Sequence, residues 1–205
     1  MREAPTLSLL KDIFNALIDS FIEQKVGIAD HFLSESLMSG LSKNLERHFS
    51  DQLFLAAGTG NKALAVLDKT VRGDRICWLD RTHGDPFELA FFDLIDEFVR
   101  HLNETCYAGI TGYEFHYARY EAGSFYRKHL DQFRSDQGRQ FSMITYLNAG
   151  WQERDGGELC IHHADGLQNI PPVWGRTVLF RSSELEHEVL LTNRLRLSIT
   201  GWLKS

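Results

Sequence analysis

Hydrophobic residues recur at helical spacing in the first part of the chain. Over residues 6–22, apolar positions three and four residues apart predict a helix with one buried face. Leucines then recur every four residues from Leu33 to Leu45. This second series surrounds Ser34 and Ser36, and either hydroxyl can cap a helix start. Two amphipathic helices are therefore expected before residue 50.

A third helix is expected to start at Asp85. Asp85 suits the N-cap position, Pro86 suits the first helical position, and Glu88 completes a capping-box pattern. Its buried stripe is expected to contain Phe87, Phe91, Leu94, Ile95, Phe98 and Leu102.

Short apolar segments replace the helical pattern from Tyr113 onward. Each is bounded by Gly, Asp, Asn or Pro, as is typical of β-strands. The expected strands cover residues 113–120, 125–131, 141–147, 158–162, 177–180, 187–191 and 195–202, with an earlier one at Thr70–Leu79. Helices followed by many short strands indicate an α+β fold, with a barrel or jelly roll packed against helices. We expect one domain over residues 1–205, in which 1–110 is mainly helical and 111–205 forms the β core.

The last expected strand has two contrasting faces. Alternate positions are Leu195, Leu197 and Ile199 on one face, and Arg196, Ser198, Thr200 and Trp202 on the other. A register shifted by one residue would expose the aliphatic set, so the polar set is expected to face the barrel interior. A buried arginine is costly unless it meets an anion, and the guanidinium fork suits a carboxylate.

His129 and Asp131 share one face of an expected strand, so both can reach one metal ion. A second His-x-Asp pattern, His163 to Asp165, runs into Gly166 and indicates a strand end and turn. His187 is the candidate third ligand, although taken alone it fits a surface histidine between two glutamates. Two histidines and one carboxylate leave three positions open on iron, as an Fe(II) oxygenase requires.

Composition excludes several other classes of protein. The net charge of −6 argues against nucleic-acid binding, and no apolar run approaches the length of a membrane span. The three cysteines are far apart and include no CxxC, which argues against a disulfide framework or a zinc ribbon. The start of the chain lacks a signal-peptide pattern, so we expect a cytoplasmic protein.

Several segments together resemble the 2-oxoglutarate- and Fe(II)-dependent oxygenases, and within them the prolyl hydroxylases. The segments are Tyr120 to Asp131, Tyr146-Leu-Asn148, Asp155-Gly-Gly-Glu-Leu159, His187-Glu-Val and Arg196 to Trp202, with Arg72-Gly-Asp74 and Trp78 upstream. The set is similar to the hypoxia-inducible-factor prolyl hydroxylases of animals. It is more similar to their bacterial relatives, which act on a proline of elongation factor Tu. The resemblance implies a double-stranded β-helix, a cupin-like jelly roll.

The resemblance also implies roles for individual residues. The implied Fe(II) ligands are His129, Asp131 and His187. The residues implied around 2-oxoglutarate are Arg196, on its far carboxylate, with Tyr146, Tyr120 and Thr200. Fe(II), 2-oxoglutarate and O₂ are therefore the implied cofactor and co-substrates, with ascorbate as a candidate reductant.

A further set is implied to contact the substrate: Trp202, Asp74, Arg139 and Tyr126. Trp202 fits a pocket wall and a capping aromatic at a barrel end equally well. Asp74 and Arg139 resemble a pair near the family's substrate entrance, although a surface salt bridge without function fits nearly as well. Residues from about 58 to 71 match the mobile loop that covers bound peptide in the family.

The expected function is therefore hydroxylation of a prolyl residue in a protein, for which elongation factor Tu is the expected partner, with release of succinate and CO₂. Two alternatives stay open. One is an oxygenase of the same fold that acts on a free amino acid or small metabolite. The other is a non-catalytic metal-binding sensor barrel, which would not need Arg196 on its inner face.

Overall fold

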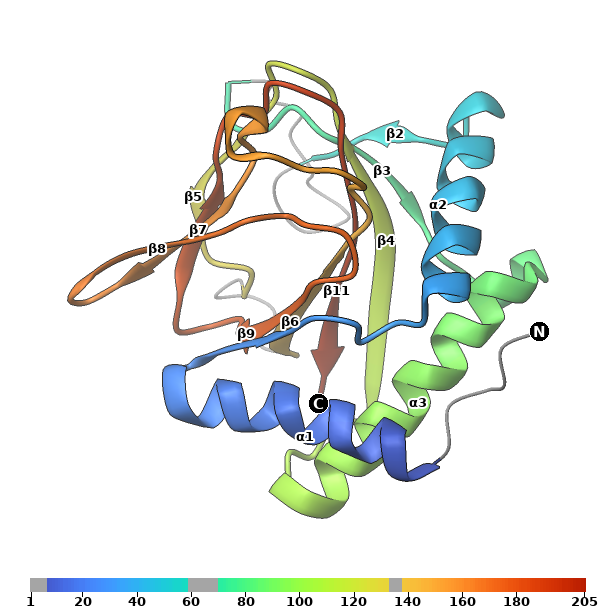
Figure 1. The fold of residues 1–205 in the computed structure, drawn as a ribbon, viewed down its shortest axis with the longest axis vertical. Helices are drawn as coiled ribbons and strands as arrows, with labels where there is room; N and C mark the ends of the chain where they lie inside the picture. The colour runs from blue at the N-terminus through green and yellow to red at the C-terminus, as the bar shows by residue number, and fades with distance from the viewer. Residues whose placement is uncertain (1–6, 59–69, 133–137) are drawn as a thin grey trace.

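The computed structural model describes residues 7–58, 70–132 and 138–205. Within these ranges, three α-helices pack beside two antiparallel sheets (Figure 1). The helices are α1 (Leu7–Gln24), α2 (Glu35–Ser50) and α3 (Pro86–Cys106). The strands are β1 (Val26–Ala29), β2 (Leu55–Ala56), β3 (Arg75–Trp78), β4 (Gly112–Tyr120), β5 (Tyr126–His129), β6 (Arg139–Tyr146), β7 (Leu159–His163), β8 (Gly166–Ile170), β9 (Thr177–Arg181), β10 (Glu186–Val189) and β11 (Arg196–Lys204). Most of the loop expected at residues 58–71 lies outside the described residues.

The two sheets divide the hydrophobic core into two main parts. The larger sheet has the strand order β1-β9-β6-β11-β4-β3-β2, and the smaller has the order β5-β10-β7-β8. Alternation along β6 sends Ile144 and Tyr146 into the core between the sheets, where Ile161 of β7 joins them. Phe141 and Met143 point the opposite way, into the core shared with the helices. The predicted α+β class with a jelly-roll core is confirmed.

All three expected helices are present in the structure. The Ser34 hydroxyl accepts a hydrogen bond from Leu37 N at 3.3 Å, so Ser34 rather than Ser36 caps α2. The Asp85 side chain accepts from the backbone N of residues 87 and 88 and caps α3, with Pro86 in its first turn as predicted.

Two expectations for α3 are wrong. Glu88 does not complete the capping box, because its carboxylate is fully buried and faces Asn44 and His83. Phe87 is 39% exposed rather than part of the buried stripe, and its ring covers Gly40 of α2. Periodicity alone could not show that α2 crosses α3 at Gly40.

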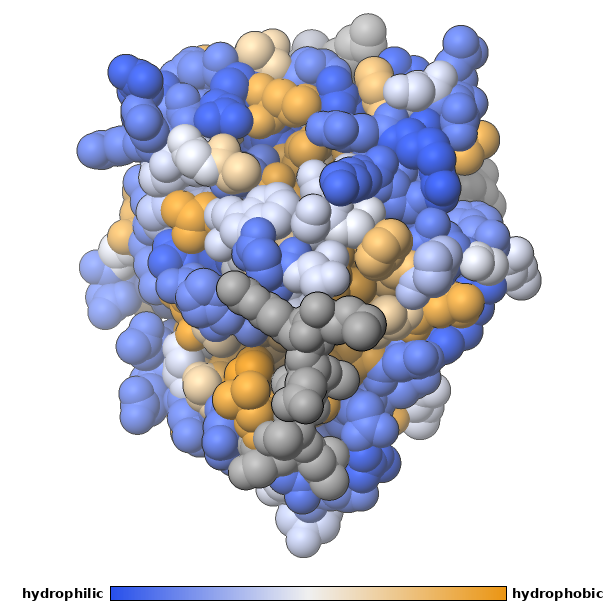
Figure 2. Space-filling view, turned by 45° about the vertical axis from the view of Figure 1, so that its right-hand side comes forward, coloured by the Kyte–Doolittle hydropathy of each residue, from blue (hydrophilic) through white to orange (hydrophobic). Residues whose placement is uncertain are grey.

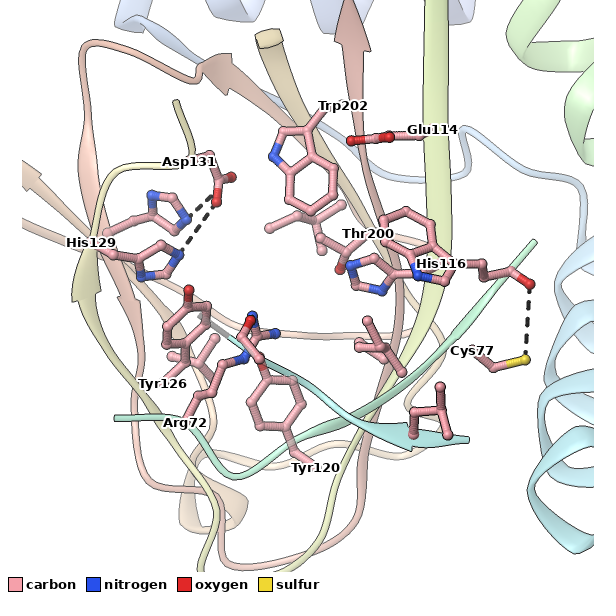
Figure 3. A pocket seen from close by; sticks show the side chains of 18 of the residues that line it. Arg72, Cys77, Glu114, His116, Tyr120, Tyr126, His129, Asp131, Thr200 and Trp202 are labelled. Carbon is pink, nitrogen blue, oxygen red and sulfur yellow. Dashed lines mark hydrogen bonds and ion pairs between the residues drawn. The ribbon is translucent and has the colours of Figure 1, made fainter. Parts of the chain in front are cut away.

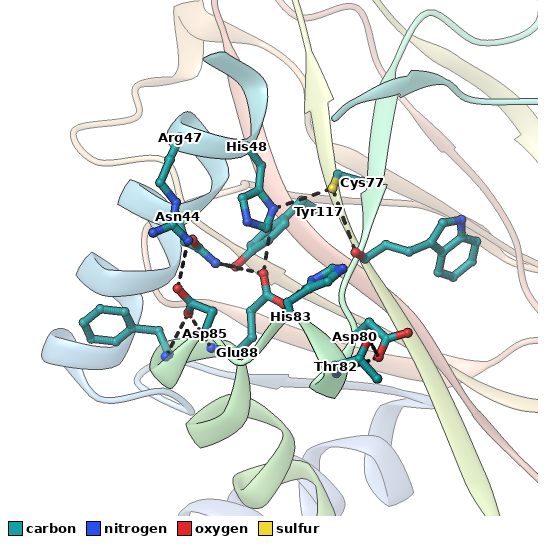
Figure 4. Close-up of polar contacts among 12 residues, drawn as sticks. Asn44, Arg47, His48, Cys77, Asp80, Thr82, His83, Asp85, Glu88 and Tyr117 are labelled. Atoms are coloured by element: carbon teal, nitrogen blue, oxygen red, sulfur yellow. Dashed lines mark hydrogen bonds and ion pairs between the residues drawn. The ribbon is translucent and has the colours of Figure 1, made fainter. Parts of the chain in front are cut away.

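A buried polar network joins the helices to the larger sheet (Figure 4). Asn44 Nδ2 donates to Glu88 Oε1 at 2.8 Å and to the hydroxyl of Tyr117 on β4 at 3.2 Å. Arg47 pairs with Asp85 at 2.9 Å, which adds a contact between α2 and the start of α3. Because a buried carboxylate is costly unless it is hydrogen-bonded, these partners fix the relative positions of α2, α3 and β4.

The strands expected in the second half are all present, with their ends shifted by a few residues. The strand expected at residues 70–79 is shorter, since β3 covers only Arg75–Trp78. Three strands were not predicted: β1, β2 and β8. The last two are exposed edge strands with little apolar alternation, and β1 is only four residues long.

Strand β11 has the predicted orientation. Leu197 and Ile199 are buried in the core shared with the helices, whereas Arg196, Thr200 and Trp202 line a cavity between the sheets. The side of the molecule that includes the helices is covered mainly by hydrophilic side chains, with small hydrophobic patches among them (Figure 2). No helix within the described ranges is long and apolar enough to cross a membrane.

The tight pairing of β11 with β4 gives a prediction about stability. A methyl group at Gly201 would lie 2.2 Å from the Phe115 ring and 2.3 Å from the Glu114 carbonyl oxygen. We expect Gly201→Ala to lower the free energy of unfolding by about 2 kcal/mol, because such overpacking forces the backbone to shift. Urea denaturation measures the change, with Gly112→Ala as control, since nothing lies within 4 Å of that position. Equal stability of the two variants would contradict the packing described.

Candidate active site

The three expected metal ligands lie together at the smaller sheet, and Figure 3 shows two of them, His129 and Asp131. His129 ends β5, Asp131 follows two residues later, and His187 of β10 pairs with His129 across the strands. His129 Nε2 lies 3.4 Å from Asp131 Oδ1, and His187 Nε2 lies 3.5 Å from Asp131 Oδ2. The three ligand atoms all fall within 4.8 Å of one another. Two imidazoles and one carboxylate arranged in this way suit a divalent transition metal such as iron.

Backbone carbonyls orient both imidazoles. His129 Nδ1 lies 2.8 Å from Arg127 O, and His187 Nδ1 lies 3.2 Å from Leu185 O. Since a carbonyl only accepts hydrogen bonds, each Nδ1 is the protonated nitrogen and each Nε2 presents its lone pair. The Tyr126 ring also stacks on His129, with ring centroids 3.6 Å apart.

The charges of the ligands suit a cation. Burial raises the pKa of Asp131, but His187, His129 and a 2.6 Å hydrogen bond from Ser142 outweigh that effect and hold it far below its usual value. Burial lowers the pKa of His187 to about 4. At neutral pH the site therefore has an anionic carboxylate and a neutral His187, which are the forms that bind metal.

Arg196 lies in the same cavity and is 3% exposed. Its guanidinium carbon lies 5.0 Å from the ring centroids of both Tyr120 and Tyr146, and Nε donates to Gly157 O at 2.7 Å. Among the described residues, neither Arg196 Nη2 nor the Tyr146 hydroxyl has a hydrogen-bond partner. Leaving such groups unpaired is costly, so this end of the cavity fits an anion with acceptor oxygens, such as a carboxylate.

Gly157 sets how Arg196 is held. Its φ is +78°, and a side chain there would begin 3.0 Å from both Arg196 Cδ and Thr192 Oγ1. Glycine is therefore required both for the backbone conformation and for the close approach of the arginine. The Asp155-Gly-Gly segment thus forms a turn and also positions the Arg196 side chain.

The cavity has a volume of about 490 Å³, which is large enough for a small ligand. It brings together the metal-ligand set with Tyr120, Arg196 and Thr200. Tyr146 is not among its lining residues and lies beside the Arg196 guanidinium instead. The structure therefore groups every residue expected around iron and 2-oxoglutarate.

The four residues expected at the substrate are also close to the cavity, but one expected pair is wrong. Asp74 is held by Arg72 through two hydrogen bonds of 2.7 and 2.6 Å, and Arg139 pairs with Glu114 at 2.9 Å. Asp74 is buried, and Arg72, which is two residues earlier in the chain, already supplies its ion pair from the same segment. Arg139 also covers the Trp202 ring at 3.4 Å.

Sequence reasoning assigned no role to three residues of the site. Arg72 holds Asp74 and lies 4.1 Å from the Tyr126 ring centroid. Ser142 holds Asp131, and Glu114 holds Arg139. In the sequence, Ser142 is a polar residue at the otherwise apolar start of the strand expected at 141–147. This pattern could have indicated that its side chain faces the cavity.

Comparisons with known proteins agree with this geometry. Residues 115–204 match the model of the 2OG-Fe(II) oxygenase superfamily. A prolyl-4-hydroxylase structure from Pseudomonas putida is 34% identical, with a TM-score of 0.84 over 94% of this chain and 98% of that one. A Trichoplax adhaerens prolyl hydroxylase, in complex with a peptide fragment of the hypoxia-inducible factor oxygen degradation domain, shares the fold. Its TM-score is 0.86 at 24% identity, over 100% of this chain and 94% of that one.

Curated relatives match over a shorter region. A PKHD-type hydroxylase from Acaryochloris marina is 31% identical over 90 residues, which are 43% of this chain and 41% of the relative. One from Methylobacillus flagellatus is 32% identical over 93 residues, or 42% and 41% of the two chains. This chain thus matches about two fifths of the length of each of these relatives. With the nearly full-length match to the Pseudomonas enzyme, these findings show that the chain belongs to the 2OG-Fe(II) oxygenase superfamily, among the homologues of the prolyl 4-hydroxylases.

Proposed function

We propose that this chain is a 2-oxoglutarate- and Fe(II)-dependent dioxygenase that hydroxylates a prolyl residue of a protein, with elongation factor Tu as the first substrate to test. The observation that carries the proposal is the shared cavity. It holds a His-Asp-His set together with a buried arginine that has an unpaired guanidinium nitrogen.

His129, Asp131 and His187 would hold Fe(II), and Arg196 would bind the far carboxylate of 2-oxoglutarate. When bound, Fe(II) supplies the O₂ activation that couples decarboxylation of 2-oxoglutarate, to succinate and CO₂, with hydroxylation of a C–H bond. The protein's contribution is to orient the reactants. The carbonyl of Gly157 and the two flanking tyrosines hold the Arg196 guanidinium in one direction.

A non-catalytic sensor barrel explains these features less well. Metal binding alone needs the two histidines and Asp131, and it gives no use to a buried arginine with an unpaired nitrogen. A co-substrate carboxylate gives that nitrogen an acceptor.

One wall of the cavity suits a prolyl ring. The rings of Trp78, His116 and Trp202 have centroids between 5.1 and 6.4 Å apart, and all three line the cavity. Burial lowers the pKa of His116 to about 4, so this ring is uncharged at neutral pH. The buried Trp202 indole N–H has no partner among the described residues and can donate to a peptide carbonyl. An apolar ring next to a carbonyl is what an X-Pro segment presents.

Arg196 gives a test of co-substrate binding. We expect Arg196→Gln to raise the KM for 2-oxoglutarate about 10- to 100-fold, because a charge-assisted hydrogen bond contributes about 1.5–3 kcal/mol. Fe(II) affinity should stay unchanged. Succinate formation against 2-oxoglutarate concentration measures the effect, with Arg194→Gln as control, since Arg194 is a partly exposed arginine that pairs with Asp155. An unchanged KM in Arg196→Gln would place the carboxylate anchor elsewhere.

The substrate is tested by mass spectrometry. Purified protein, Fe(II), ascorbate as reductant and 2-oxoglutarate are incubated with purified elongation factor Tu, which fits the expected cytoplasmic location. We expect one added oxygen on a single proline, and none with Asp131→Ala, which removes a metal ligand. Succinate formed with a metabolite extract, but no oxygen on any protein of a lysate, would instead favour the small-molecule oxygenase.

His116 gives a prediction about pH. Its pKa is about 4 in the folded protein against 6.5 ordinarily, so the unfolded chain binds more protons between these values. Stability should therefore fall as pH drops from 6.5 towards 4. We expect the loss between pH 7 and pH 5 to be about 2 kcal/mol smaller in His116→Phe. Urea denaturation at both pH values measures this difference in stability loss. His163→Gln is the control, because His163 lies at a hairpin turn and its replacement should leave the wild-type loss unchanged. An equal loss in wild type and His116→Phe would refute this account.

A further inference from the structure

A second group of metal-binding side chains lies on the smaller sheet, on its outer face. Leu159 and Ile161 of β7 point into the core between the sheets, so Cys160 and His162 point outward. On the paired strand β10, His187 faces the cavity, so Glu188 also points outward, directly opposite Cys160. This face lies on the side of the molecule away from α2 and α3 (Figure 1).

The three side chains are already close enough to share one ion. A thiol, an imidazole nitrogen and a carboxylate oxygen all fall within 4.8 Å of one another. His162 Nε2 and Glu188 Oε1 are 2.9 Å apart. Across the described ranges, only this cluster and the His129, Asp131 and His187 set have such a spacing. Two separate strands therefore bring three different donor types to one point without any change in the backbone.

Accessibility also suits a metal site. Cys160 is almost fully buried and is a free thiol, whereas the side chains of His162 and Glu188 are 23% and 29% exposed. An ion can thus reach the imidazole and the carboxylate from solvent and meet the sulfur beneath them. The two strands that carry the donors are joined by a continuous four-residue ladder, which keeps the three side chains in position.

We propose that Cys160, His162 and Glu188 form a second metal site, on the outer face of the smaller sheet, for a divalent ion of the Zn²⁺ type. Sulfur, nitrogen and oxygen donors together select Zn²⁺ and similar ions over Mg²⁺ and Ca²⁺, which prefer oxygen alone. Three protein ligands leave a fourth tetrahedral position for water. Sulfur distinguishes this site from the His129, Asp131 and His187 set, which contains none.

Metal at this site would join β7 to β10. His187 lies one residue before Glu188 on β10, with its side chain on the opposite face. An ion held by Cys160 and Glu188 would therefore cross-link the strand that carries one of the cavity histidines. We expect it to stabilise the smaller sheet, since an ion that binds only the folded chain raises the melting temperature.

Co²⁺ titration of the full chain tests the proposal without measuring activity. Co²⁺ replaces Zn²⁺ in such sites, and a thiolate ligand gives it a near-ultraviolet charge-transfer absorption that histidine and carboxylate ligands do not. We expect two Co²⁺ per chain, with this absorption accompanying one of them. Cys160→Ser should remove the absorption and one equivalent, and His162→Gln should weaken the same equivalent at least tenfold. Asp131→Ala should remove the other equivalent and keep the absorption.

Matched controls address the exposed thiol and a neighbouring histidine. Cys106→Ser removes an exposed thiol and His163→Gln removes the next histidine on β7, and neither should change the titration. In Asp131→Ala, added Zn²⁺ should raise the melting temperature, and His162→Gln in that background should abolish the rise.

Three results would overturn the proposal: a single Co²⁺ per chain that is lost in Asp131→Ala, no thiolate absorption, or an absorption that survives Cys160→Ser. The first two would leave His162 and Glu188 as a simple hydrogen-bonded pair. His162→Gln keeps the test decisive if the buried Cys160→Ser fails to fold, because His162 is partly exposed.

Discussion

Strand β11 must satisfy two environments at once, and the rest of the structure depends on this constraint. It pairs with β4 on one side and with β6 on the other, so it cannot shift without breaking both ladders. Its aliphatic face closes the core shared with the helices, and its other face carries Arg196, Thr200 and Trp202 into the cavity. Moving the strand by one residue would place a guanidinium among Leu and Phe side chains, at a cost of several kcal/mol. The same strand register therefore determines both the packing of the core and the position of Arg196 in the cavity.

The features that sequence predicted are those set by short-range geometry. Alternation in β11 showed which side of the strand Arg196 faces, and the spacing of His129 and Asp131 showed that they share a face. The start of α3 followed from Asp85 and Pro86, because capping is a contact between near neighbours in the chain. Each of these inferences needs only the local geometry of a strand or a helix.

The features that sequence did not predict depend on contacts between distant segments. Glu88 looked like a capping residue, but Asn44, forty-four positions earlier, supplies its hydrogen bond in the folded chain. Arg139 was expected to pair with Asp74, yet Glu114, twenty-five positions earlier on another strand, holds it. The pairing of His187 with His129 depends on β10 lying beside β5, which one-dimensional patterns do not specify. Sequence reasoning could name His187 as a candidate third ligand, but the residues around it fitted a surface histidine as well.

Gly157 has a consequence for which ligands can be accommodated. Its carbonyl holds Arg196 Nε, and its α-carbon stands where any side chain would push the arginine away. The metal ligands are fixed at the other end by the backbone carbonyls behind their imidazoles. A dicarboxylate that contacts both ends must therefore fit between two groups whose positions are fixed. Because the backbone of Gly157 sets the position of Arg196, it limits the number of carbons between the two carboxylates of such a ligand. It does so without touching the ligand's reactive end.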